Sequence, residues 1–332
     1  MIKKILVSSS TALVGRKMLQ ASLLVALFSS AAAIALAVPQ SRQVASTPAQ
    51  PAQKLFSTPK QAADALVQAA ESYDLSTLEQ ILGPESENLL SSEDPVRDKN
   101  TAAEFAAKAR QKTEVNVNPT NAKRSVLLVG DDGWPLPIPI VEKGGNWIFD
   151  TKAGRQEMLF RRIGSNELDA IEICRGYVDA QYEYAMQKHD NAEVNQYAQR
   201  VISTPGKHDG LAWWNPDGSI GGPIAEGIAK ALQQGYTSKS QPYHGYYFKI
   251  LKGQGPAAPL GQMSFVVEGA MIGGFALAAA PAEYRVTGVQ TFVVSHDGVV
   301  YQKDLGPDTL KIFSTMQLYN PDKTWRPTDD NW

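Results

Sequence analysis

The chain has 332 residues, of which 43% are hydrophobic, and this length allows two ordinary domains, each with its own core. A mean hydropathy of -0.25 excludes a polytopic membrane protein. The 32 basic and 34 acidic side chains give a formal charge of -2. The sequence has no cluster of Lys and Arg residues, so it does not predict binding to nucleic acid or to an anionic lipid surface.

Residues 1–37 have the layout of a secretory signal. Four basic residues come first, an apolar run through Leu23–Phe28 follows, and the segment ends at Ala35-Leu36-Ala37. A basic region, an apolar region and a small-x-small site predict cleavage after Ala37 and a secreted, periplasmic protein without stable membrane insertion. The alternative is an uncleaved anchor in the inner membrane, since the apolar run approaches spanning length. Cleavage leaves 28 basic and 34 acidic side chains, a formal charge of -6.

Residues 38–54 are rich in Pro, Gln, Ser and Ala, which predicts a flexible linker. We expect the first domain over residues 55–160. Thr58-Pro59-Lys60-Gln61 is a capping-box start for a helix. Two further helices are expected over residues 76–82 and 101–112.

Three strands should follow, over residues 125–129, 136–142 and 146–150. Asp131 and Asp132 precede a glycine between two of these strands, so they are typical of a turn rather than of an acid/base pair. The alternating prolines at 135, 137 and 139 each lack an N–H donor, which places their strand at an edge or a bulge. Helices followed by an antiparallel meander predict an α+β domain.

The second domain is expected over residues 161–332, after a charged helical connector that ends at Gly164. A long helix should begin at Asn166 and lie on a sheet, because its apolar residues share one face. That face holds Leu168, Ile171, Cys174, Val178, Tyr182 and Ala185. A further helix is predicted over residues 190–201, a long loop over 203–222, and a short helix over 223–234.

Residues 271–306 hold the densest strand signals of the chain. Strands are predicted over residues 246–251, 264–267, 270–279, 289–295 and 299–303. Asp297-Gly298 predicts a two-residue type I′ hairpin, whose two central residues both need positive φ. Both domains therefore belong to the α+β class, with helices packed on an antiparallel meander sheet.

The chain resembles a family of exported bacterial proteins of unknown function, of the domain-of-unknown-function type, from Phe56 onward. This resemblance implies no activity. The stretches that carry it are 134–139 (WPLPIP), 149–154 (FDTKAG), 161–168 (RRIGSNEL), 177–185 (YVDAQYEYA), 203–211 (STPGKHDGL), 242–246 (PYHGY), 271–277 and 301–306.

Each half also resembles a known fold. On its helix order and the closing strand at residues 145–150, the first half resembles the nuclear-transport-factor-2-like or cystatin-like cone. On the helix that opens at Asn166-Glu167 and the hairpin at 288–300, the second half resembles the globular head of type IV pilins and pseudopilins. A pilin needs an apolar stem before this helix, where the chain has Glu157 and Arg161. The resemblance therefore concerns the fold and not filament assembly.

Few residues have the arrangement of a catalytic or metal site. Cys174 lies on the apolar helix face and should be a buried, inert thiol. The four histidines have no metal-ligand spacing, and we predict no metal and no cofactor. We name His208, Asp209 and His244 as candidate catalytic residues, because loop and strand could bring them into one cleft with Asp209 orienting an imidazole.

The candidate ligand-binding residues are Trp213, Trp214, Tyr243 and His244. Aromatic residues in a long loop also serve to fasten the loop to its domain. Our leading hypothesis is a non-catalytic periplasmic binding or envelope-associated module, which uses the 203–222 loop and the cleft between the domains. Its partner is expected to be an envelope protein or a small ligand.

The alternative is a small periplasmic hydrolase centred on His208, Asp209 and His244. This hydrolase requires both histidines to reach one substrate, so a separation of more than about 10 Å between them would exclude it. A flat loop with both tryptophans buried is incompatible with the binding-loop hypothesis.

Overall fold

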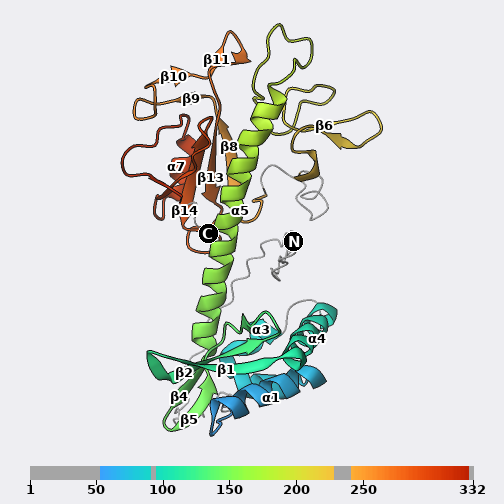
Figure 1. The fold of residues 1–332 in the computed structure, drawn as a ribbon, viewed down its shortest axis with the longest axis vertical. Helices are drawn as coiled ribbons and strands as arrows, with labels where there is room; N and C mark the ends of the chain where they lie inside the picture. Colours follow the sequence, from blue (N-terminus) through green and yellow to red (C-terminus); the bar gives the residue numbers. More distant parts are fainter. Residues whose placement is uncertain (1–52, 91–94, 228–240, 329–332) are drawn as a thin grey trace, which may run out of the picture. The chain divides into compact units, whose positions relative to one another are not determined.

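Figure 1 shows a computed structural model of the protein, which describes residues 53–90, 95–227 and 241–328. The chain divides into two compact units, the first ending at Thr151 and the second beginning at Lys152. Both contain helices and antiparallel sheets, which confirms the α+β class. The expected signal at 1–37, nearly all of the expected linker, and most of the predicted helix at 223–234 lie outside the described residues. Within the described ranges, every helix is too short or too polar to cross a bilayer.

The first unit begins with α1 (Pro59–Ser72), whose start the capping motif predicts correctly. Thr58 Oγ1 accepts a hydrogen bond from the Gln61 N–H at 3.2 Å, and Gln61 Oε1 accepts one from the Ser57 N–H. Further helices follow, and the last begins six residues earlier than predicted. They are α2 (Leu75–Leu82), the 3-10 turn η1 (Pro84–Ser86), α3 (Glu87–Leu90) and α4 (Pro95–Gln111).

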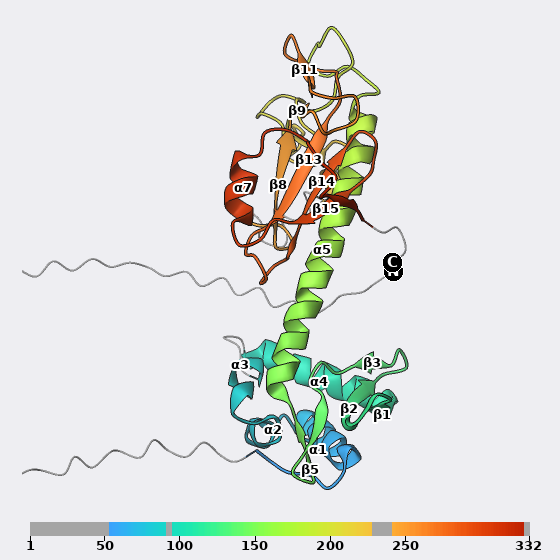
Figure 2. The same cartoon turned by 90° about the vertical axis from the view of Figure 1, so that its left-hand side faces the viewer.

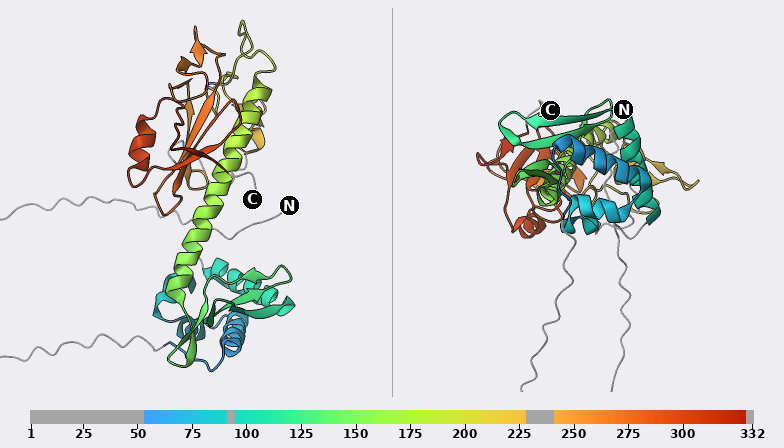
Figure 3. Two further views of the ribbon diagram at one scale, coloured as in Figure 1. Left: turned by 60° about the vertical axis from the view of Figure 1, so that its left-hand side comes forward. Right: turned by 90° about the horizontal axis from the view of Figure 1, so that it is seen from below.

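The sheet of the first unit has the order β1-β2-β4-β5, with β3 also paired to β2. Its strands are β1 (Thr113–Asn118), β2 (Asn121–Val129), β3 (Trp134–Pro135), β4 (Ile140–Lys143) and β5 (Asn146–Phe149). The predicted strand at 136–142 is largely replaced by irregular chain, because prolines 137 and 139 interrupt the ladder. The strand β1 was not predicted. The helix α1 (blue) packs on the green strands and on α4 (Figure 3).

The second unit is organised on α5 (Thr151–Tyr184), a single helix of 34 residues. The prediction of two helices separated at Gly164 is wrong, and the expected domain boundary at 160/161 falls inside α5. A glycine within a helix costs about 1 kcal/mol relative to alanine, but it does not end a helix whose neighbouring residues continue it. Ile171, Cys174 and Val178 are buried as expected, whereas Leu168 is 43% and Tyr182 44% exposed.

The main sheet of this unit is antiparallel, in the order β16-β15-β14-β13-β8. Its strands are β8 (Tyr246–Leu251), β13 (Ala276–Pro281), β14 (Gln290–Ser295), β15 (Tyr301–Asp304) and β16 (Arg326–Pro327). The alanine-rich β13 is buried along its whole length, since α5 covers one face and α7 (Thr309–Thr315) the other (Figure 2). On the α7 side, Lys249 Nζ donates to the Phe313 and Ser314 carbonyls at 3.0 Å, at the negative end of α7.

Three predictions for the second unit need correction. Residues 190–201 are irregular rather than helical. The strand expected over 270–279 is interrupted, giving β12 (Ala270–Met271) and then β13, with Gly274 at φ 135° between them. The turn at Asp297-Gly298 is longer than a two-residue hairpin, because the last β14–β15 pair is Val293 with Tyr301. Within residues 294–300, only Gly298 has positive φ, and its N–H donates to the Ser295 carbonyl.

Short hairpins lie at the edge of this sheet. The strand expected at 264–267 is divided between two of them. The pairs are β6 (Trp213–Trp214) with β7 (Ile220–Gly221), β9 (Gly253–Gln254) with β10 (Met263–Ser264), and β11 (Val266–Val267) with β12.

Candidate functional site

The 203–222 loop is fastened to the C-terminal end of α5 through Tyr184. The phenol of Tyr184, the last residue of α5, donates to the His208 carbonyl at 2.5 Å. The ring of Tyr184 stacks on His189 with 3.9 Å between the centroids. The loop also closes on itself, because the Ser203 N–H donates to the Ala212 carbonyl at 2.7 Å. The predicted loop is therefore held in place on the second unit by hydrogen bonds.

His208 and Asp209 do not act as a pair. The nearest carboxylate to the His208 ring is that of Asp190, with Nδ1 and Oδ1 3.7 Å apart. Asp209 instead accepts hydrogen bonds from the backbone N–H of Thr204 at 2.7 Å and from its hydroxyl at 2.8 Å. The short turn 204–209 directs the Asp209 carboxylate back to Thr204 and not to the His208 imidazole.

Asp209 remains ionised in this turn. Burial opposes the charged carboxylate, but the two bonds from Thr204 and the positive charges of Arg200 and Lys207 outweigh it and lower the pKa of Asp209. Arg200 Nε lies 3.6 Å from Asp209 Oδ2. A carboxyl with a lowered pKa is a weak general base at neutral pH.

His244 precedes β8 and contacts α5 at a different place. Its Nδ1 is 2.5 Å from Oδ2 of Asp169, and its ring contacts Tyr243 with 4.3 Å between the centroids. Asp169 and Tyr184 are 15 residues apart in one helix, so their α carbons are separated by about 22 Å. The structure therefore does not bring His244 together with His208, whose main chain is bound to Tyr184. One catalytic centre cannot include both imidazoles within hydrogen-bond reach.

The two tryptophans have different environments. Trp213 packs on the core of the second unit, and its ring lies 4.6 Å from that of His208 and 5.8 Å from that of His189. Trp214 is 55% exposed. Trp213 therefore fastens the loop, while Trp214 and the half-buried Tyr243 and His244 are accessible.

Cys174 has no catalytic features. It is fully buried, and burial raises the pKa of its thiol to about 12. In the part of the chain that the structure describes, no group of three or more His, Cys, Asp or Glu side chains could hold a metal ion.

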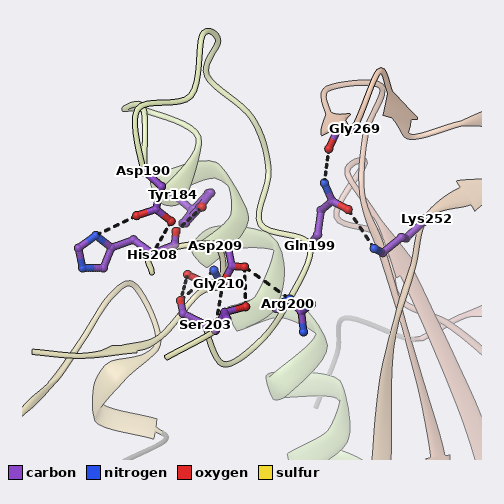
Figure 4. Close-up of polar contacts among 11 residues, drawn as sticks. Tyr184, Asp190, Gln199, Arg200, Ser203, His208, Asp209, Gly210, Lys252 and Gly269 are labelled. Carbon is purple, nitrogen blue, oxygen red and sulfur yellow. Dashed lines mark hydrogen bonds and ion pairs between the residues drawn. The ribbon is translucent and has the colours of Figure 1, made fainter. Parts of the chain in front are cut away.

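A cavity of about 310 Å³ opens beside the end of α5. We call it the α5 cavity. Four segments of the second unit form it: the end of α5, the chain 196–209, the chain after β8 and the β11–β12 turn (Figure 4). The residues that line it are Tyr184, Gln196, Tyr197, Gln199, Arg200, Asp209, Lys252 and Gly269.

The amide of Gln199 holds two of these segments together. Its Nε2 donates to the Gly269 carbonyl at 2.7 Å, and its Oε1 accepts from Lys252 Nζ at 2.9 Å (Figure 4). Gln196 makes a similar link, since its Oε1 accepts from the Met271 N–H at 3.3 Å. Side-chain amides thus set the distance between the chain at residues 196–200 and the β11–β12 hairpin.

A second cavity, of about 370 Å³, lies in the first unit between the start of α1 and the edge strand β1. Its lining holds one exposed ion pair, Lys60 with Asp64 at 2.7 Å, which is internal to α1. An exposed i,i+4 pair is worth only a few tenths of a kcal/mol and directs no charge to a ligand. The smaller α5 cavity is therefore the better candidate site.

A comparison with protein families identifies the chain. The model of the family described as "Protein of unknown function (DUF2950)" matches residues 53–328. The chain belongs to this family. The resemblance to a domain-of-unknown-function family is confirmed. A search of curated proteins and a search of solved structures gave no match. The resemblances of the two halves to a cone-shaped fold and to a pilin head stay predictions.

Sequence reasoning named one lining residue of the α5 cavity, Asp209, and missed the others. Gln199 and Arg200 lie in a segment predicted as helix, and Lys252 follows an ordinary strand. None belongs to a motif. The loop composition of residues 203–222 was the available signal, because long ordered loops carry many binding sites.

Proposed function

We propose that the protein is an exported, non-catalytic binding module of the periplasm, and that it takes a small polar ligand in the α5 cavity. Export is supported by the basic, apolar and small-x-small segments of residues 1–37. The observation that carries the binding function is the α5 cavity, which has polar side chains from separate segments around one space.

The same surroundings argue against a hydrolase there. The described residues that line the cavity include no histidine, cysteine or serine. The one carboxylate, Asp209, accepts a hydrogen bond from Thr204 at each of its oxygens and has a lowered pKa, which makes it a weak general base. Of the two expected partner classes, an envelope protein and a small ligand, the cavity favours the small ligand.

A screen of small polar compounds by NMR tests this proposal on protein isolated from the periplasmic fraction. The isolated chain is expected to begin at Val38. Ligands should shift the backbone amide signals of residues that line the cavity, above all Gln196, Gln199, Arg200 and Gly269. Ligands that shift signals only in other places, or a screen without any ligand, would contradict the proposed site. Protein that begins at Met1 in the cytoplasm would contradict export.

A further inference from the structure

The charged residues around the α5 cavity are positive in balance, although the whole chain is slightly acidic. Arg200 and Lys252 contribute two cations, and Asp209 contributes the one carboxylate. The two phenols add no charge at neutral pH. Burial raises the pKa of Tyr184 to about 12, and burial together with Tyr182 raises that of Tyr197.

Asp209 is unsuited to bind a cation. Its Oδ1 accepts from the Thr204 N–H, its Oδ2 accepts from the Thr204 hydroxyl, and Oδ2 also faces Arg200 at 3.6 Å. A single carboxylate that already binds Thr204 and faces the positive charge of Arg200 is a weak site for a metal or ammonium ion.

The cations have donors to spare. The ammonium of Lys252 carries three N–H groups, of which Gln199 takes one among the described residues. The guanidinium of Arg200 carries five, and its ion pair with Asp209 uses the Nε side. The side chain of Arg200 is 55% exposed, so its remaining donors are accessible.

We propose that the α5 cavity binds a small organic anion, with its acidic group held by Arg200 and Lys252 and its body against Tyr184 and Tyr197. This inference rests on the proposed binding function and narrows its ligand class. Two fixed cations favour a carboxylate or a phosphate monoester, since charge-assisted bonds to these groups are the stronger ones. Gln199 fixes the position of Lys252, which lowers the entropy lost when the anion binds.

Matched probes separate charge from shape. Benzoate and benzamide have nearly the same size, but only benzoate is an anion. We expect benzoate to shift the cavity amide signals and to bind at least about tenfold more tightly than benzamide, the factor of one charge-assisted hydrogen bond. Phenyl phosphate distinguishes the two sources of charge. Tighter binding than benzoate assigns a phosphate monoester, and weaker binding assigns a carboxylate.

Substitutions test the two cations. Arg200→Gln and Lys252→Gln should each weaken benzoate binding about tenfold, while Lys311→Gln, which changes an exposed lysine on α7, should leave it unchanged. Added salt should weaken benzoate binding and leave benzamide binding the same. Thermal melting followed by circular dichroism checks that the variants fold.

Two results would overturn the proposal that the ligand is an anion and leave the proposed binding function standing. In the first, benzamide binds as tightly as benzoate; in the second, both variants bind benzoate as tightly as the unchanged protein does. Failure of all three probes also overturns the anion class. The proposed function itself falls only if the wider screen finds no ligand in the cavity.

Discussion

The α5 segment from Asn166 to Tyr184 has polar side chains at both ends. The two sets of side chains bind the backbone of different parts of the second unit. At the first end, Glu167 Oε1 accepts hydrogen bonds from the Val289 and Gln290 N–H groups at 2.8 and 3.0 Å, and Asn166 Nδ2 donates to the Thr287 carbonyl. These polar side chains satisfy the backbone that leads into β14.

At the second end, two neutral side chains of α5 bind the backbone of the following chain. Gln181 binds the N–H and the carbonyl of Ala198, both at 2.8 Å, and Tyr184 binds the carbonyl of His208. The charged Arg200 and Lys252 are left to face the α5 cavity. Residue type alone therefore does not mark a site. What matters is whether the charged groups still have donors or acceptors free once the main chain is satisfied.

The largest effect should come from Gln181→Ala. This residue is fully buried, and three hydrogen bonds join it to Ala198 and to the Tyr177 hydroxyl. Its loss leaves the Ala198 N–H and carbonyl unpaired, so the free energy of unfolding should fall by about 3 kcal/mol. Urea denaturation measures this. Asp179→Ala, on an exposed position of the same helix, is the control and should change stability by less than about 0.5 kcal/mol.

Glu167→Ala should have the next largest effect, because two N–H groups of the chain entering β14 lose their acceptor. We expect a loss of about 2 kcal/mol in the free energy of unfolding. The matched control is Glu172→Ala, since Glu172 is exposed and pairs only with Arg175 at 3.0 Å in the described structure. Equal stabilities of the two variants would show that the first end of the segment is not anchored by Glu167.

The smallest effect concerns pH and Asp209. The pKa of its carboxyl is lower in the folded chain than its ordinary value of 3.8. The associated stability is therefore present above pH 3.8 and is lost as the pH falls through the folded pKa. As the pH falls below 3.8 through the folded pKa, Asp209→Asn should show a shallower loss of stability than the unchanged protein. Parallel acid titrations of the two proteins measure this, and equal slopes would show that the Thr204 contacts do not stabilise the charged carboxylate.

Sequence reasoning was most reliable where neighbouring residues decide the structure. Local chemistry explains the cap at Thr58 and the turn after Asp131. The spacing of apolar residues explains the strand at 246–251 and the burial of Cys174. It failed where contacts distant in sequence decide. The irregular chain at 190–201 has a helix-like pattern, but Gln196 and Gln199 bind the hairpin at residues 269–271 instead.

By itself the sequence determined the α+β class, the family and the main strands of the second unit. The class and the strands depend on periodicity and turn residues, and the family on distinctive stretches of sequence; all of these are local properties. Only the tertiary structure decided that α5 is continuous and that Arg200 and Lys252 share one cavity. It also decided that His208 and His244 contact α5 at different places. The physical reason is that each of these depends on which distant backbone groups a polar side chain satisfies, and a linear pattern does not specify that pairing.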